Sequence, residues 1–260
     1  MVCWQLSKTC GSLRETDSVS VRGRFHSQGS CGMKFQEIDV RAGLWSRGYS
    51  RLGNVLSKSE CEDLRALYNQ PELFRSRIDM ARYRFGRGEY QYFAYPLPGL
   101  VDELRQALYV QLFEPANEWM DALKIDGEFP SDLSSFLERC HEKGQVRPTP
   151  LLLHYTAGDF NCLHQDLYGD IVFPFQVVFC LSDPEREFTG GELLLVEQQP
   201  RAQSIGNAIR LEQGEAVVIT TRYRPVKGSR GYYRTNVRHG VSPILTGERY
   251  TLGIIFHDAA

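Results

Sequence analysis

The second half of the chain, about residues 149–257, is a series of short β-rich segments, and this pattern limits the fold more than any other feature of the sequence. Turn sequences such as AGD, SDP, TGGE, EQGE and TGE separate the segments. Several short strands at such spacing are typical of a β-sandwich or barrel. The predicted strands are 150–156, 173–181, 191–197, 208–211, 215–221, 234–239 and 249–256.

The first half favours helices that would pack against this β core as a buttress. The spacing of apolar residues predicts helices over 57–69, 99–113 and 131–143. At the start of the first, Ser57 and Glu60 form a capping-box pattern, in which each side chain binds the backbone N–H of the other. We therefore expect an α+β protein whose helices precede its sheets.

Glycine and proline punctuate this helical half at two places. The segment 78–95, IDMARYRFGRGEYQYFAY, is aromatic and contains two glycines close together. Its alternation predicts a hairpin that turns at Gly86–Gly88, or alternatively a loop that faces a substrate. Further along, Pro115 is expected to kink the second helix before Trp119.

Residues 1–32 differ in composition from the rest of the chain. They are rich in Ser, Gly and Arg, show no helical or strand periodicity, and lack the apolar stretch of a secretory signal. We expect a disordered or loosely attached tail. The remainder divides into a helical N-terminal region, 33–148, and a β-rich core, 149–260.

Charge and cysteine usage indicate the compartment. The net charge is −2, and no apolar run approaches the length of a membrane span, so the sequence predicts a soluble protein without a membrane partner. The 7 cysteines are scattered and form no CxxC pair, which favours reduced thiols in the cytoplasm. Cys162, two residues before His164, is expected to be a buried spectator thiol rather than a metal ligand.

His164, Asp166 and His239 form a metal-binding pattern. With one residue between them, His164 and Asp166 project to the same side of an extended segment. His239 stands near the start of a late predicted strand, and a double-stranded β-helix, or jelly roll, would bring all three to one open end. Two imidazoles and one carboxylate form the facial triad of a non-haem Fe(II) oxygenase. Zinc is the main competitor, because similar ligands serve hydrolytic zinc sites.

Arg249, on the strand after His239, favours an iron oxygenase over a zinc enzyme. A guanidinium fork aimed into a barrel suits a carboxylate that it can bind through two hydrogen bonds. Tyr155 could donate its hydroxyl to the same carboxylate. Taken alone, a surface arginine and an ordinary core tyrosine would be the simpler interpretations. His154 and His257 are expected to be structural.

Several motifs together resemble the 2-oxoglutarate/Fe(II)-dependent dioxygenase superfamily, in its prolyl 4-hydroxylase-like branch. These motifs are YTAGDFNCLHQD, FTGGELLL, RHGVSP and GERYTLGIIF. More closely, the segment from about 33 to 260 resembles a bacterial group of such oxygenases with a poorly defined substrate. RPTPLLLHY, LHQDLYGD, FPFQVVF and EQQPRAQS carry this second resemblance.

The resemblance implies His164, Asp166 and His239 as iron ligands, with no catalytic residue beyond the metal centre. It also implies Arg249, assisted by Tyr155, as the clamp on the distal carboxylate of 2-oxoglutarate. Fe(II), 2-oxoglutarate and O2 would then hydroxylate a C–H bond with release of succinate and CO2, and ascorbate is a candidate reductant. Animal collagen hydroxylases carry Lys where this chain has Arg, and both residues occur across the superfamily.

One local feature bears on the substrate. The segment 222–238, RYRPVKGSRGYYRTNVR, has no acidic residue and is predicted to rim the active-site mouth. Its basic and aromatic side chains could follow a phosphate backbone and stack on bases, or could form a solvated loop. An alkylated nucleobase, a protein or peptide side chain and a small metabolite all remain candidate substrates. A catalytically silent jelly-roll binding module and a zinc hydrolase remain alternatives. The basic residues of the segment are Arg222, Arg224, Lys227, Arg230, Arg234 and Arg238.

Overall fold

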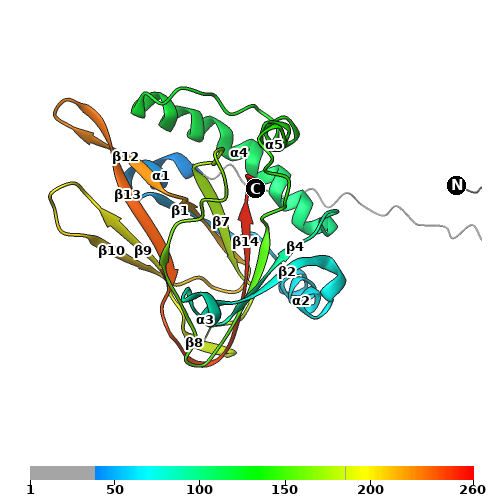
Figure 1. The fold of residues 1–260 in the computed structure, drawn as a ribbon. Coiled ribbons are helices and arrows are strands. Elements are labelled where there is room, and N and C mark those ends of the chain that lie inside the picture. Colours follow the sequence, from blue (N-terminus) through cyan, green and yellow to red (C-terminus); the bar gives the residue numbers. More distant parts are fainter. Residues whose placement is uncertain (1–38, 185) are drawn as a thin grey trace, which may run out of the picture. The chain divides into compact units, whose positions relative to one another are not determined.

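The computed structural model describes residues 39–184 and 186–260, which belong to one compact unit, Phe35–Ala260. The tail expected over 1–32 lies outside the described residues. The described chain folds into two β-sheets and several helices (Figure 1). All strand pairs within the two sheets are antiparallel. The predicted β-rich second half is thereby confirmed.

The larger sheet has 8 strands, drawn from both halves of the chain. Its central strand is β14 (Ile244–Ile255), which pairs with neighbours on both sides and also with the short β8 (Phe188–Gly190). Across the sheet the order is β1 (Tyr49–Asn54), β11 (Glu215–Thr220), β7 (Phe175–Cys180), β14, β5 (Leu151–Thr156), β4 (Glu89–Phe93) and β2 (Phe74–Asp79). The first half of the chain therefore contributes strands as well as the predicted helices.

The smaller sheet has 6 strands. Its order is β10 (Ile205–Ile209), β9 (Leu193–Gln198), β13 (Gly231–Val241), β6 (Phe160–His164) and β3 (Gly86–Arg87), while β12 (Tyr223–Gly228) pairs with β13. A buried apolar cluster joins the two sheets, with Leu193 and Val237 from the smaller one and Val217 and Ile219 from the larger. Burial of this apolar surface is the main force that holds the sheets together.

The helices come mostly from the first half, as predicted. They are α1 (Val40–Arg47), α2 (Lys58–Ala66), α3 (Met80–Tyr83), α4 (Gly99–Leu123) and α5 (Leu133–Glu142), with the 3-10 turns η1 (Leu67–Asn69) and η2 (Pro71–Leu73). The capping box of α2 is confirmed. Ser57 N donates to Glu60 Oε2 at 2.7 Å, and Glu60 N donates to Ser57 Oγ at 3.2 Å.

Helix α4 is longer than its sequence predicts. Pro115 lies inside it, and the helix continues to Leu123. A proline in a helix interior costs about 3 kcal/mol, so packing must offset that loss. The turn after Pro115 supplies the packing, because Trp119 is fully buried with its ring 4.6 Å from that of Phe175 in β7. Helix α4 therefore runs on through Pro115 to Leu123, and a kink at that proline stays a prediction.

The prediction of a hairpin that turns at Gly86–Gly88 is wrong, because Gly86–Arg87 is the strand β3, which pairs with β6. β2 pairs with β4, and Met80–Gly88, which contains α3 and β3, connects them. The aromatic alternation in 83–85 was therefore wrongly assigned to a strand, since Tyr83 ends α3 and Phe85 is exposed. The strand predicted at 208–211 begins and ends earlier, as β10.

Two further expectations concern cysteines and membranes. Cys61, Cys140, Cys162 and Cys180 are free thiols, and Cys162 is exposed, which corrects its predicted burial. It is exposed because β6 lies near the edge of the smaller sheet, beside the two-residue β3. Across residues 39–184 and 186–260, no helix has both the length and the apolar character needed to cross a membrane.

Candidate metal centre and pocket

A cavity of about 210 Å³ is lined by side chains from both sheets. β4, β5, β7 and β14 contribute from the larger sheet, and β6, β9 and β13 from the smaller one. All of the residues predicted from the sequence as site residues line this one cavity. They are Tyr155, His164, Asp166, His239 and Arg249.

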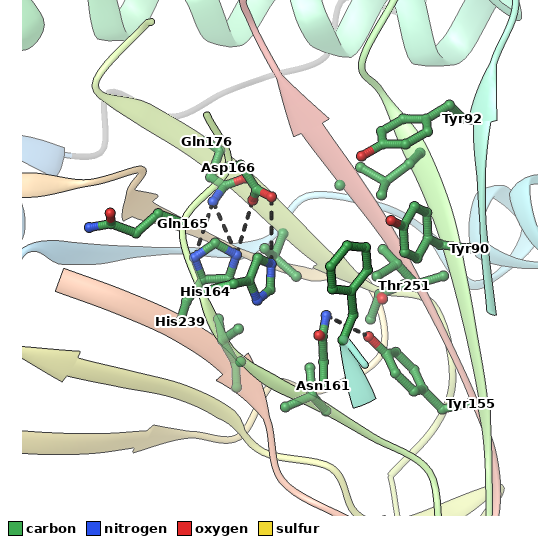
Figure 2. A pocket seen from close by; sticks show the side chains of 18 of the residues that line it. Tyr90, Tyr92, Tyr155, Asn161, His164, Gln165, Asp166, Gln176, His239 and Thr251 are labelled. Carbon is green, nitrogen blue, oxygen red and sulfur yellow. Dashed lines mark hydrogen bonds and ion pairs between the residues drawn. The ribbon is translucent and has the colours of Figure 1, made fainter. Parts of the chain in front are cut away.

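The two histidines and the aspartate meet because their strands are neighbours. His164 and His239 are directly opposed in the register of β6 and β13, and their ring centroids are 4.2 Å apart. Asp166 follows the end of β6 and places one oxygen 3.1 Å from His239 Nε2 and the other 3.5 Å from His164 Nε2 (Figure 2). Donor atoms of the three residues lie within 4.8 Å of one another, so together they could hold one metal ion.

Backbone contacts orient the first histidine and the residue that follows it. His164 Nδ1 lies 2.7 Å from the Cys162 carbonyl oxygen, which can only accept a hydrogen bond. Nδ1 therefore carries the proton and Nε2 is free to act as a metal donor. Gln165 also lines the cavity, and its side-chain amide donates to the carbonyls of Arg222 and Val237, both at 2.8 Å. These bonds fix the chain between His164 and Asp166.

Two tyrosines support the carboxylate. The Tyr168 hydroxyl donates to Asp166 Oδ1 at 2.6 Å, and the Tyr92 hydroxyl donates to the Tyr168 oxygen at 2.8 Å. Such outer partners fix the orientation of a metal-ligating carboxylate. On the opposite side of the cavity, Tyr90, Tyr92 and Tyr155 face the histidines and the aspartate (Figure 2).

Burial and charge shift the pKa values of this group in different directions. Burial alone would raise the pKa of the Asp166 carboxyl, but the adjacent imidazoles of His239 and His164 hold it well below its usual range. Burial lowers the pKa of His239, so that imidazole stays neutral and able to bind a metal. For His164, burial opposes protonation, yet the hydrogen bond and charge of Asp166 raise its pKa. The low pKa of Asp166 keeps its carboxylate negatively charged in the cavity wall.

Arg249 supplies a positive charge in the same cavity. It is directly opposed to Tyr155 in the register of β14 and β5. It is only 3% exposed, and its Nη1 has no hydrogen-bond partner among the described residues. Burying an unpaired guanidinium lowers the stability of the fold unless a partner binds to it. Tyr155 is fully buried beside it, and Asn161 Nδ2 donates to the Tyr155 hydroxyl at 3.4 Å. The pair could thus bind an anion.

The Gly190–Gly191 turn lets β14 approach this pocket closely. Both glycines have positive φ, at 77° and 67°. A Cβ on Gly190 would lie 2.4 Å from the Pro243 carbonyl oxygen, and one on Gly191 would lie 3.0 Å from Arg249 Cδ. Only glycine combines this backbone conformation with the available space. The TGGE turn signal in the sequence therefore reflects the packing of Arg249.

The sequence did not identify every residue of the site. The contacts of Tyr168, Gln165 and Gln176 could not be predicted, because Gln165 is the variable position of the His-x-Asp motif and the other two residues lie outside it. Gln176 Nε2 lies 3.3 Å from His239 Nε2, a contact that depends on how β7 faces β13. The position of Tyr168, close after the His-x-Asp motif, was the one signal available. His154 and His257, expected to be structural, do not line the cavity.

The basic segment 222–238 forms β12 and most of β13. Arg224 is buried and binds Glu197 through both Nε at 2.8 Å and Nη2 at 3.1 Å, so its charge is already neutralised. Arg234 lies over the ring of Tyr223 at 5.1 Å. No residue of the segment lines the cavity, whose lining on this strand begins at His239. A role for 222–238 in substrate binding stays a prediction.

Comparison with known proteins also indicates an oxygenase. Residues 88–259 match a protein family described as "Oxygenase, catalysing oxidative methylation of damaged DNA". Two uncharacterized proteins of Mycobacterium tuberculosis, from strains CDC 1551 and H37Rv, are each 54% identical over 168 residues, which are 65% of this chain and 72% of theirs. The crystal structure of a Pseudomonas putida prolyl-4-hydroxylase superposes with a TM-score of 0.52 and 17% identity, covering 85% of this chain and 97% of that one. This likeness shows a fold of the jelly-roll type.

Proposed function

The chain belongs to the oxygenase family that its residues 88–259 match, and from that premise we propose that it is an Fe(II)- and 2-oxoglutarate-dependent dioxygenase. It would hydroxylate a C–H bond of its substrate and release succinate and CO2. We further propose that its two antiparallel sheets are the two faces of a double-stranded β-helix, with the cavity at one open end. The observation that carries the functional proposal is the donor set of His164, Asp166 and His239 opposite the unpaired Arg249.

The donor set fits Fe(II). Two imidazoles and one carboxylate occupy three positions of an octahedral ion and leave three for other ligands. The Cys162 carbonyl holds Nδ1 of His164 and leaves Nε2 as the atom that would face a metal, and burial lowers the pKa of His239, which favours its neutral, metal-binding form. These features support the assignment of the three residues as iron ligands.

Arg249 and Tyr155 fit the co-substrate. 2-Oxoglutarate has a 2-oxo acid end that can chelate a metal and a second carboxylate at its far end. The buried Nη1 of Arg249 lacks a partner among the described residues, and a carboxylate would satisfy it. The Tyr155 hydroxyl lies on the opposed residue of the neighbouring strand and could donate to the same group. We propose these two residues as the clamp.

When bound, iron and 2-oxoglutarate supply the oxidation, in which one atom of O2 enters succinate and the other enters the substrate as a hydroxyl group. The protein contributes position and environment. Arg249 orients the co-substrate, Tyr168 holds the Asp166 carboxylate, and the apolar cavity wall, including Leu193 and Val178, limits access of water. No general acid or base is required of the chain.

For the substrate we propose an alkylated base in DNA. The enzyme would hydroxylate the alkyl carbon bonded to the base, and the alkyl group would then leave as an aldehyde, which restores the unmodified base. The description of the family supports this choice. The basic segment 222–238 also supports it, since it could follow a phosphate backbone even with Arg224 neutralised. A protein or peptide side chain is the competing substrate class.

The test is an anaerobic titration of the protein with Fe(II) and 2-oxoglutarate, followed by admission of O2 and assay of succinate. A weak visible charge-transfer band is expected, and it should be lost in His164→Ala and Arg249→Ala. If iron binds but neither band nor succinate appears, the proposal fails and a catalytically silent binding module takes its place. Activity without 2-oxoglutarate or O2 would instead indicate a zinc hydrolase.

A further inference from the structure

The segment 82–87, RYRFGR, borders the cavity and has no role in the site described above. It belongs to the connection between β2 and β4 and joins α3 to β3. We call it the 82–87 rim. Phe85 lines the cavity, and every residue of the rim except Gly86 is exposed. A run of exposed aromatic and basic side chains at a cavity mouth requires an explanation.

The aromatic part of the rim is a preformed stack. Tyr83 is 50% exposed and Phe85 is 48% exposed. Their ring centroids are 5.7 Å apart with an interplanar angle of 20°. The two rings therefore stack on each other while both remain open to solvent. Such a surface can extend the stack to a planar ligand, because stacking on an aromatic side chain is available to every nucleobase.

The basic part of the rim is unneutralised. Arg82, Arg84 and Arg87 are exposed, and their side chains form no hydrogen bond or ion pair with any residue in 39–184 or 186–260. No acidic residue occurs between Met80 and Gly88. This differs from the basic segment 222–238, where Arg224 is buried against Glu197. Unpaired arginines beside open rings favour a polyanionic ligand with planar groups.

The rim is anchored to the strand that carries the first metal donor. Cys162 N donates to the Phe85 carbonyl at 2.8 Å, and Phe85 N donates to the Met80 carbonyl at 3.0 Å. Gly86, with φ 138°, packs so closely on β6 that a Cβ would lie 2.2 Å from the Phe160 carbonyl oxygen. These contacts hold Phe85 beside the pocket. Arg84 is in the left-handed region at φ 61°, which is uncommon for arginine and is often found at functional sites.

We propose that the 82–87 rim binds single-stranded DNA. A base at the cavity mouth would stack on Tyr83 and Phe85, and the arginines would bind the flanking phosphates. This inference rests on the proposed function, because it names the surface that would present a base to the metal centre. Peptide recognition is disfavoured, since an ordinary peptide has neither the repeated charge nor the planar groups that this surface matches.

The experiment measures binding of a fluorescein-labelled single-stranded DNA of about 12 nucleotides. The DNA carries one central methylated adenine. The full-length protein is loaded with Fe(II) and 2-oxoglutarate and kept free of O2. Fluorescence anisotropy then measures binding over a range of salt concentrations. Phe85→Leu keeps an apolar side chain but removes the ring, so affinity should fall at least about fivefold with the salt dependence unchanged. Phe85→Tyr should restore the affinity.

Arg84→Asn tests the charge separately. Asparagine tolerates the left-handed backbone, so the rim should keep its conformation. The slope of log affinity against log salt should become shallower by about 0.7, the value for one phosphate contact with a single strand. Lys124→Asn is the matched control, because Lys124 also caps a helix in the left-handed region, at φ 53°, and does not line the cavity. It should leave both affinity and slope unchanged.

Two results would overturn the inference. One is a wild-type protein that does not bind the DNA at low salt, or that prefers a glutamate-rich peptide. The other is wild-type binding that neither Phe85→Leu nor Arg84→Asn alters. Failure of the proposed function is a separate observation, namely the absence of the charge-transfer band and of succinate in iron-loaded protein, whatever its affinity for DNA.

Discussion

The Tyr168 hydroxyl donates a 2.6 Å hydrogen bond to Oδ1 of Asp166, the single carboxylate among the candidate metal donors. Burial and the charge of Asp166 raise the pKa of Tyr168 well above its usual range, so the hydroxyl keeps its proton and remains a donor. The Tyr92 hydroxyl in turn donates to Tyr168. The orientation of the carboxylate therefore depends on a residue that no metal motif contains.

Removal of this hydroxyl should weaken metal binding without unfolding the protein. In Tyr168→Phe we expect metal affinity to fall about 10- to 100-fold, as is usual when a partner of a ligating carboxylate is lost. Anaerobic titration with Co(II), followed by its visible absorption, measures the change. Tyr109→Phe is the control, since it removes another buried hydroxyl, one that donates to the Pro130 carbonyl away from the cavity. Equal affinity in Tyr168→Phe and wild type would contradict the supporting role.

Two buried arginines should respond oppositely to replacement by methionine. Arg105 is 1% exposed and binds Asp258 at 2.8 Å, so Arg105→Met should destabilise the fold by about 3–5 kcal/mol by leaving Asp258 without that partner. Arg249, also buried, forms no such pair with any residue that the structure describes, so Arg249→Met should keep or raise the free energy of unfolding. Chemical denaturation measures both effects.

The same Arg249→Met variant should bind 2-oxoglutarate more weakly than the wild type. Truncation of one partner of a buried charge pair costs about 2–5 kcal/mol, which is at least about a 30-fold loss of affinity. Calorimetric titration of the metal-loaded variant with 2-oxoglutarate gives the value. A stable variant with wild-type affinity would show that the carboxylate binds elsewhere.

Metal should stabilise the folded chain, and it should do so through His239. At a free Co(II) concentration of about 100 times Kd, the free energy of unfolding should rise by about 2.7 kcal/mol, and a chelator should reverse the rise. His239→Ala should abolish the effect, as measured by thermal unfolding with and without Co(II). His154→Ala, in a histidine that lies outside the cavity, should retain it. Stabilisation that survives in His239→Ala would place the metal at another site.

Cysteine reactivity should separate Cys162 from the buried thiols. Burial raises the pKa of Cys140 to about 11 and that of Cys61 to about 12. At pH 8 the thiolate of Cys140 is then roughly one part in a thousand, and raising the pH toward 11 increases it. Brief treatment with iodoacetamide at pH 8 should label the peptide with the exposed Cys162 before those with Cys61, Cys140 and Cys180, as read by mass spectrometry. Equal labelling of Cys140 would show that α5 opens readily.

The predictable part of the site consists of residues whose side-chain type and strand position together specify a role. His164, Asp166 and His239 could be grouped from the sequence because each adjoins a β-rich segment, and the structure brings them to one cavity. Arg249 and Tyr155 were predictable for the same reason, and they are directly opposed on neighbouring strands. Alternation along strands determines which side chains share a face, and it can be seen in the sequence.

The unpredictable part depends on contacts between distant segments. The Tyr168 hydroxyl that bonds Asp166 also accepts a hydrogen bond from Tyr92, which is 76 residues earlier in the chain. The continuation of α4 beyond Pro115 depends on the burial of Trp119 against β7, which local helix propensity cannot express. Aromatic residues at the alternate positions 83 and 85 predict a strand, but in the structure Tyr83 and Phe85 form an exposed stacked pair. In each case tertiary packing overrides a local signal.

The directly opposed pairs His164–His239 and Arg249–Tyr155 have a consequence for how this protein can evolve. Each site residue is held by strand register, and a shift of one position turns its side chain to the opposite face of the sheet. Turns such as the one between β9 and β10 can therefore gain or lose residues freely. A single-residue insertion within β13 or β14 would remove a metal donor or the arginine from the cavity. In this family, length changes should accumulate in the loops, while the strands should diverge by substitution alone.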